Sequence, residues 1–169
     1  LGIPGGTTTL MAAMMTASPE VVSMLLEYGT NVNNVDVMGN DAFMFASSMG
    51  RYDNLQCWFE RVKGYDFVRR NIVLGATPLI AAANMGANKF KTVSILLMQG
   101  ARVDAMTHSG FSVLMAACAN EDSDPKVVKA ILELYDRVRD LGLVGGISYR
   151  IRSQTTKWKL LRGTAKLMV

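Results

Sequence analysis

The sequence predicts an all-α protein built as a stacked array of helix-turn-helix units. Two observations carry this prediction. Four nine-residue segments can be aligned, and their leading glycines, Gly6, Gly39, Gly75 and Gly110, are spaced by 33, 36 and 35 residues. Each segment is also followed by the signals of a second helix and then by a loop. A period of this size is typical of short helical repeats in which every unit stacks on its neighbours.

The first helix of each unit is expected to be short and apolar. The clearest segment reads GATPLIAAA at residues 75–83. In unit one, we expect Thr8 to be the N-cap, because a threonine hydroxyl accepts hydrogen bonds from the exposed backbone N–H groups of a first turn. Paired alanines such as Ala82 and Ala83 leave room for the second helix to approach closely.

The second helix of each unit begins with a capping signal and carries a leucine and valine face. In unit one, we expect Ser18 to cap this helix and Pro19 to occupy its first turn, where proline is tolerated. The apolar face that follows consists of Val21, Val22, Leu25 and Leu26. Gly29 then ends the helix, because a left-handed backbone conformation costs glycine very little.

The pattern divides the chain into four units and a tail. The units span about residues 6–38, 39–74, 75–109 and 110–142, and the tail spans 143–169. In unit four, Asp124 and Pro125 repeat the capping device, and Tyr135 stands where a helix-ending glycine is expected. Its second helix should therefore run on to Leu141, with Gly142 as its cap. The tail combines strand-like alternation with a final helix, which is typical of a degenerate, truncated fifth unit.

Charge is unevenly distributed along a chain whose formal net charge is +4. Residues 1–140 hold 12 Lys and Arg against all 14 Asp and Glu, whereas residues 141–169 hold six basic residues and no acidic one. The basic tail has two interpretations: a solvated outer face, or a site for nucleic acid or another anionic ligand. The second interpretation would use Arg150, Arg152, Lys157 and Lys159.

Composition favours a globular protein in a reducing compartment. Half of the 169 residues are hydrophobic, which is enough for a substantial core. Cys57 and Cys118 show no CxxC spacing, and we expect two reduced, buried thiols. No apolar run approaches the ~20 residues of a membrane span, and no signal peptide is visible. We expect a cytoplasmic location, with a nuclear one also compatible. Because the sequence begins with Leu1, we expect a piece of a longer protein.

These segments resemble the ankyrin repeat, whose pattern is Gly-x-Thr-Pro-Leu-His-x-Ala-Ala, then Val-Val-x-x-Leu-Leu, then Gly-Ala-x-Val-Asn/Asp. Unit three keeps most of the first part and closes with GARVD at residues 100–104, and unit one closes with GTNVN at 29–33. The resemblance extends from residue 6 to about residue 135. The histidine of the pattern is replaced by Met11, Met44, Ile80 and Met115, so its hydrogen bonds to the neighbouring turn are absent. Unit two is the most degenerate.

The resemblance implies a non-catalytic protein-interaction module. In the family, the loops between units project as β-hairpin fingers at right angles to the helices, and fingers and first helices line a concave, partner-binding surface. On this basis the candidate partner-binding residues are Val37, Met38, Asn40, Ser48, Met49, Arg69, Arg70, Val73, Leu74, Met85, His108, Ser109 and Phe111. For the apolar pairs before Gly39 and Gly75, packing on the adjacent finger is an equally good alternative.

The residue pattern predicts no catalysis, metal or cofactor. The single histidine, His108, has no accompanying acid or nucleophile, so we expect a solvated side chain at a finger tip. One histidine and two cysteines give no metal-ligand spacing. Neither glycine-rich stretch is followed by the Lys-Ser/Thr of a phosphate loop. An alternative is a regulatory or scaffold segment of a larger enzyme or channel, whose active site or pore would lie outside this sequence.

Overall fold

The computed structural model describes residues 5–85, 87–119 and 123–140. Within these residues the chain forms eight α-helices and no β-strand, so the predicted all-α repeat fold is confirmed. The helices are α1 (Thr9–Thr16), α2 (Pro19–Glu27), α3 (Ala42–Ser48), α4 (Tyr52–Arg61), α5 (Pro78–Met85), α6 (Lys89–Met98), α7 (Val113–Cys118) and α8 (Pro125–Asp140). The predicted tail, residues 143–169, lies outside the described residues.

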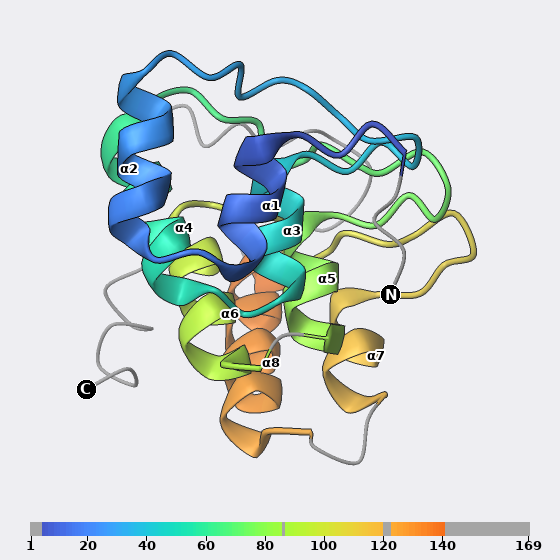
Figure 1. Cartoon of the computed structure of the whole chain (residues 1–169). Helices are drawn as coiled ribbons and strands as arrows, with labels where there is room; N and C mark the ends of the chain where they lie inside the picture. Colours follow the sequence, from blue (N-terminus) through green and yellow to red (C-terminus); the bar gives the residue numbers. More distant parts are fainter. Residues whose placement is uncertain (1–4, 86, 120–122, 141–169) are drawn as a thin grey trace.

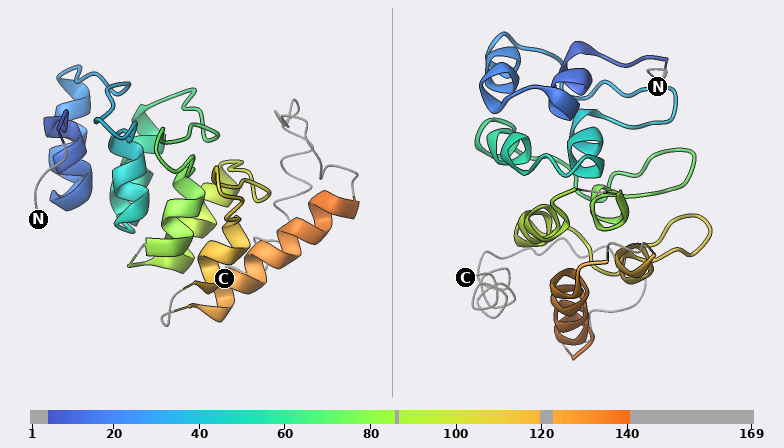
Figure 2. Two further views of the ribbon diagram at one scale, coloured as in Figure 1. Left: turned by 90° about the vertical axis from the view of Figure 1, so that its right-hand side faces the viewer. Right: turned by 60° about the horizontal axis from the view of Figure 1, so that its bottom comes forward.

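The helices form two parallel rows, and the loops between units extend to one side. The first-helix row contains α1, α3, α5 and α7, and the second-helix row contains α2, α4, α6 and α8 (Figure 1). We call residues 28–41, 62–77 and 99–112 the finger loops; they extend from the first-helix row, away from the second-helix row (Figure 2). Their predicted β-hairpin structure is not confirmed, because the described residues hold one isolated antiparallel bridge, between Met106 and Ser112.

One capping device starts every helix of the first-helix row. Side-chain oxygens of Thr8, Asp41, Thr77 and Ser112 each accept the backbone N–H three residues later, at 2.8–3.3 Å. Each of these residues lies two positions after a leading glycine, and a cap of this kind stabilises a helix by about 1 kcal/mol. The prediction for Thr8 is therefore confirmed. Ser18 occupies the N-cap position of α2, but its side chain makes no capping hydrogen bond.

The second helix of unit four is the longest described. Asp124 caps it, accepting the N–H of Lys126 at 2.9 Å. The helix passes Tyr135 and continues to Asp140, as its missing glycine predicts. The predicted end of this helix, at Leu141 and Gly142, lies outside the described residues.

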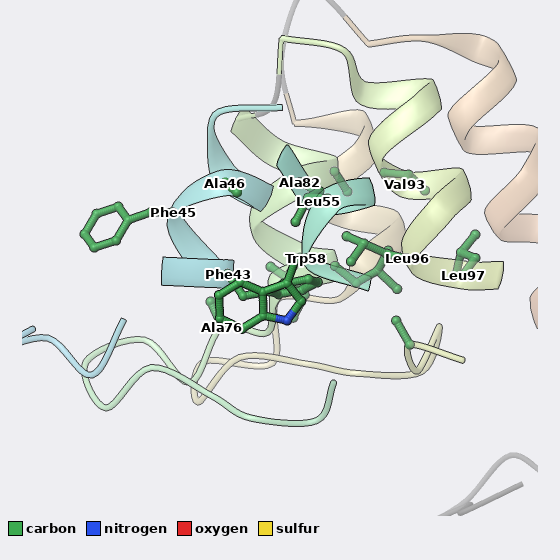
Figure 3. Packing of buried hydrophobic residues seen from close by; sticks show 14 of the residues in the cluster. Phe43, Phe45, Ala46, Leu55, Trp58, Ala76, Ala82, Val93, Leu96 and Leu97 are labelled. Carbon is green, nitrogen blue, oxygen red and sulfur yellow. The ribbon is translucent and has the colours of Figure 1, made fainter. Parts of the chain in front are cut away.

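The core runs through the whole array between the two rows. Equivalent alanines of the first-helix row, Ala13, Ala46, Ala82 and Ala117, are all at most 7% exposed. The second helices contribute larger buried side chains, such as Leu55 of α4 and Leu96 of α6, and Figure 3 shows both in the same cluster as Ala46 and Ala82. Full burial of a leucine contributes about 1.5–3 kcal/mol, and one unit could not bury these faces alone.

Two predicted core residues are exposed because they lie at the ends of the described array. Val21 is 43% exposed, whereas its counterparts Thr92 and Val127, which face the preceding unit, are at most 1% exposed. Cys118, predicted to be packed, is exposed, whereas Ala83 at the same position is buried. In both cases no described unit stacks on that face. The other thiol, Cys57, is buried as expected.

Candidate partner-binding surface

Buried polar side chains fix the turn of the first two finger loops. Asp36 is buried, and its Oδ1 atom accepts the N–H groups of Met38 at 2.9 Å and Asn40 at 2.7 Å. Asn71 does the same in the second loop, accepting the N–H groups of Leu74 and Ala76 at 3.0 and 3.2 Å. These turns have no β-ladder, so the side-chain hydrogen bonds are what fixes their backbone conformation.

The third loop and a contact between loops complete this framework. Thr107 accepts the N–H of Phe111 at 3.0 Å, in the place of the carboxylate and amide of the other two loops. The Nδ2 atom of Asn71 donates to Oδ1 of Asn40 at 3.2 Å, which joins the second loop to the first. Asn40, a predicted partner-binding residue, therefore uses its side chain inside the framework.

Single backbone hydrogen bonds join each finger loop to the segment stacked before it, which is the turn at Gly5 for the first loop and the preceding finger loop for the other two. The N–H of Val37 donates to the carbonyl of Gly5 at 3.0 Å, that of Ile72 to Met38 at 2.9 Å, and that of His108 to Leu74 at 2.8 Å. Every acceptor lies one residue before a leading glycine, so the contact repeats along the array. The stacked loops thus form one continuous surface rather than three separate ones.

This stacking explains the leading glycines Gly39 and Gly75. Both have positive φ angles, +77° and +69°. A Cβ atom at Gly39 would lie 2.9 Å from the backbone nitrogen of Ile72, and one at Gly75 would lie 2.4 Å from the His108 ring. Glycine is therefore required both for its left-handed conformation and for the close approach of the next loop.

Apolar side chains before these glycines point to solvent although their backbones are stacked. Val37 is 65% exposed, Val73 53% and Leu74 57%, whereas Met38 is half-buried. The sequence left two alternatives, packing on the adjacent loop or exposure to a partner. The backbones pack on the adjacent loop, whereas the side chains of Val37, Val73 and Leu74 remain accessible. None of the four carries a charge.

The C-terminal ends of the first helices carry the next predicted residues, at the opposite end of each helix from the finger loop that precedes it. Met49 and Met85 are 41% and 65% exposed. Ser48 is half-buried, and its hydroxyl donates to the carbonyl of Phe45 at 2.9 Å. Of the predicted residues at these helix ends, the two methionines are the accessible ones.

The two predicted arginines mainly support the loops. Arg69 pairs with the buried carboxylate of Asp41 at 3.2 Å and donates to the carbonyl of Asn33 at 3.4 Å. Arg70 donates to the carbonyls of Gly75 and Met106, and so joins the second finger loop to the third. Arg70 is exposed and could also contact a partner, whereas Arg69 is half-buried.

Burial sets the electrostatics of the carboxylate beneath this surface. Burial raises the pKa of Asp41, and this effect exceeds the opposing hydrogen bonds from the Met44 N–H and the Tyr65 hydroxyl and the attraction of Arg69. The pKa of Tyr65 is raised well above its ordinary value, first by burial and then by the neighbouring Asp41. The Tyr65 hydroxyl donates to Asp41 at 2.9 Å, so the phenol stays protonated.

The remaining predicted residues lie on the third finger loop. His108 and Ser109 are exposed, as expected for a finger tip. Phe111 is half-buried and packs against the core, so only part of its side chain is accessible, and its partner-binding role stays a prediction.

Sequence reasoning missed Ile72 and Met106, which are 69% and 49% exposed on the second and third finger loops. A signal for the first was present, since residues 72–74 form an apolar run directly before Gly75.

Other candidate chemistry gives no site in the described part of the chain. No group of three or more His, Cys, Asp or Glu side chains is placed to hold a metal ion there. None of its helices is long and apolar enough to cross a membrane. The tail residues proposed for anionic ligands, Arg150, Arg152, Lys157 and Lys159, lie outside the described residues.

The family assignment follows from the repeated helix pairs and from the comparison with known proteins. The ankyrin-repeat family model matches residues 5–37 and 74–108, which contain the α1–α2 and α5–α6 pairs. Among curated proteins, none matches the chain significantly. The α3–α4 and α7–α8 pairs, outside the two matches, repeat the same helix pairing and the same side-chain N-cap. The chain therefore contains ankyrin repeats within an all-α repeat fold.

Proposed function

We propose that this chain is a non-catalytic protein-interaction module that binds a partner through its finger loops and the concave groove lined by its first helices. Ankyrin repeats are generally protein-interaction modules. The observation that carries the proposal is the uncharged apolar surface formed by Val37, Ile72, Val73 and Leu74, each more than half exposed. We call these four residues the finger patch.

The finger patch differs from ordinary scattered surface apolar residues because its members are held on stacked loops. Isolated exposed apolar residues are normal on soluble proteins. Here the hydrogen bond from the Ile72 N–H to the Met38 carbonyl places members of two loops side by side. A contiguous apolar patch favours association, because its burial removes apolar surface from water.

Preorganisation strengthens this argument. Asp36 and Asn71 fix the turns, so a partner would pay little conformational entropy to order them. Met49 and Met85 lie at the other, C-terminal ends of α3 and α5 and are exposed, and flexible thioether side chains adapt well to varied apolar partners. We infer that the partner presents an apolar, weakly charged segment to this surface. That segment could belong to another protein or to another domain of a larger enzyme or channel.

The proposal is tested by paired substitutions with a matched control. Val73→Asp with Leu74→Asp places two charges in the finger patch, whereas Val21→Asp with Met24→Asp places two charges on exposed positions of α2. Each variant and the wild type would be used as bait for quantitative affinity capture from lysate, and each would be melted. We expect the patch variant to lose partners that the wild type and the control both retain.

The melting temperatures separate binding from folding. All four substituted side chains are more than 40% exposed, so both variants should melt close to the wild type. Equal capture by the patch variant and the wild type would contradict the proposed function. A large loss of stability in the patch variant alone would show instead that Val73 and Leu74 have a structural role.

A further inference from the structure

Residues of α4 and α6 line a groove. Both helices belong to the second-helix row, which lies away from the finger loops (Figure 2). The volume of the groove is about 860 Å³. The apolar part is formed by Phe59, Phe90, Ile95 and Met98, and mostly polar side chains from both helices make up the rest of the lining. The lining residues extend from the first turn of each helix to the last, so the groove follows their full length.

Lysines without acidic partners surround this apolar strip. Lys63 and Lys91 line the groove, and only one acidic residue, Glu60, lines it with them. Within residues 5–85, 87–119 and 123–140 the ion pairs all use arginines, and no lysine takes part. The lining therefore carries two lysines against one carboxylate, a formal net charge of +1, and Glu60 forms no salt bridge with either lysine.

Two aromatic rings of the groove each have a lysine ammonium group over one face, and of these lysines Lys91 lines the groove whereas Lys126 does not. The Lys91 Nζ atom lies 5.9 Å from the centre of the Tyr52 ring, and the Lys126 Nζ atom of α8 lies 5.9 Å from the centre of the Phe90 ring. Such contacts hold a cation in place without cancelling its charge. They also cover one face of each ring, which makes these rings poor platforms for stacking nucleic-acid bases.

A buried hydroxyl in the groove lacks a partner. Ser94 is 8% exposed, and its Oγ atom has no hydrogen-bond partner. A helical serine commonly donates to the carbonyl four residues earlier, but this bond is absent here. An unpaired buried polar group costs about 1–3 kcal/mol, but this Oγ atom is closed off from the groove surface, so the docking argument rests on the apolar strip and the lysines.

We propose that this groove is a second docking site, which binds an acidic amphipathic helix of a partner protein. Apolar side chains of the partner would lie against Phe59, Ile95 and Met98, and its carboxylates would face Lys63 and Lys91. The α4 helix has 10 residues and is therefore about 15 Å long, which matches a partner helix of about three turns. Such helices present anchors at positions i, i+3 or i+4, and i+7.

The test is a peptide-display selection on the full chain. A library of random peptides of about 16 residues would be selected for binding to the wild type and depleted on a Lys91→Glu, Met98→Glu variant. Both substituted residues are exposed, so the variant should fold, and its melting temperature would be checked. We expect enriched peptides with apolar residues at helical spacing and several Asp or Glu. Purified peptides should bind the variant at least roughly tenfold more weakly than the wild type.

Matched variants assign the binding to this groove. Lys129→Glu with Met24→Glu makes the same chemical changes on exposed positions of α8 and α2 outside the groove, and should leave peptide affinity within about twofold of the wild type. The finger-patch variant, Val73→Asp with Leu74→Asp, should also keep peptide binding. Failure of the proposed function at the finger loops is therefore distinguishable from failure of this site.

Three results would overturn the second site. If the selection yields no peptide that binds the wild type more tightly than the groove variant, the groove does not bind a helix. Equal binding by a poly-glutamate peptide or a single-stranded oligonucleotide of the same charge would show a purely electrostatic surface. If the double variant melts far below the wild type, the single substitution Lys91→Glu is used in its place. Peptide affinity equal to that of the wild type in this single variant would be the third result against the proposal.

Discussion

Units two and three are neighbours with the same helix pair but different interiors. The α5–α6 pair of unit three lies within a match to the ankyrin-repeat model, whereas the α3–α4 pair of unit two lies outside both matches. At one equivalent, fully buried position unit three has Leu79 and unit two has Phe43. The comparison shows that the repeat architecture persists when the residues of its core are exchanged.

Unit two fills its core with rings supplied partly by a loop. Phe43 of α3 lies 5.6 Å from Trp58 of α4, measured between ring centres, and the two rings are adjacent in Figure 3. Tyr65 and Phe67 of the second finger loop lie 4.4 and 5.8 Å from Phe43. Tilted and edge-to-face pairs at these distances each stabilise by about 0.5–1.5 kcal/mol beyond burial. Here the loop is part of the core rather than a connector.

The two units also cap their first helices differently. Thr77 caps α5 with a neutral hydroxyl, whereas Asp41 caps α3 with a carboxylate that is 1% exposed. A buried carboxylate needs partners, and Tyr65 and Arg69 of the second finger loop supply them. The cap, the loop and the aromatic cluster of unit two therefore depend on one another.

The largest expected effect comes from truncating the equivalent core residues. Phe43→Ala should lower the free energy of unfolding by about 3–5 kcal/mol and Leu79→Ala by about 2–5 kcal/mol. Both changes leave cavities, but Phe43→Ala also removes ring contacts, so we expect it to cost more and to reduce the near-UV circular dichroism signal. Urea unfolding of both variants would measure the difference. A greater loss in Leu79→Ala would contradict an interdependent unit two.

The next effect separates close packing from backbone strain. Gly39→Ala should cost about 2–4 kcal/mol, because the new Cβ atom combines a left-handed conformation with a collision against the Ile72 backbone. Gly100 has a φ of +93°, but a Cβ atom added there would meet no atom within 4 Å, so Gly100→Ala should cost only about 1–2 kcal/mol. Denaturation midpoints compare the two, and equal losses would mean that the loops can separate without cost.

The sequence predicts features that depend on local chemistry. The N-cap at Thr8 needs only the residues of its own turn, and the continuation of α8 past Tyr135 needs only the absence of a glycine. The accessibility of Val37, Val73 and Leu74 depends on how the loops stack, so the sequence leaves it open. Their binding role stays a prediction.

Features that join distant residues could not be predicted from the sequence. Asp41 and Tyr65 are 24 residues apart, and no residue pattern indicates that the tyrosine folds back onto the cap. The groove between α4 and α6 likewise requires the relative placement of two helices from different units. The prediction for Cys118 is wrong because the repeat pattern assumes that another unit follows, whereas no described unit covers that face.

The smallest expected effect is a difference in pH dependence between the carboxylates of the two units. Burial raises the pKa of Asp41 in the folded state, so its contribution to stability is present at low pH and is lost as pH rises through that raised pKa. In unit three, the hydrogen bond from Arg102 to Asp104, with Nε to Oδ1 at 2.8 Å, lowers the pKa of Asp104. Its contribution is present above the ordinary aspartate pKa of about 3.9 and is lost as pH falls.

Asp41→Asn and Asp104→Asn should therefore have opposite consequences. Relative to wild type, Asp41→Asn should lose stability as pH falls from about 6 to about 3, because the wild-type carboxylate becomes protonated more readily when folded. Asp104→Asn should gain relative stability over the same range, because the wild type loses its Arg102 interaction. Urea midpoints measured for all three proteins at each pH would show this. If the relative stabilities of both variants change in the same direction with pH, burial does not raise the pKa of Asp41.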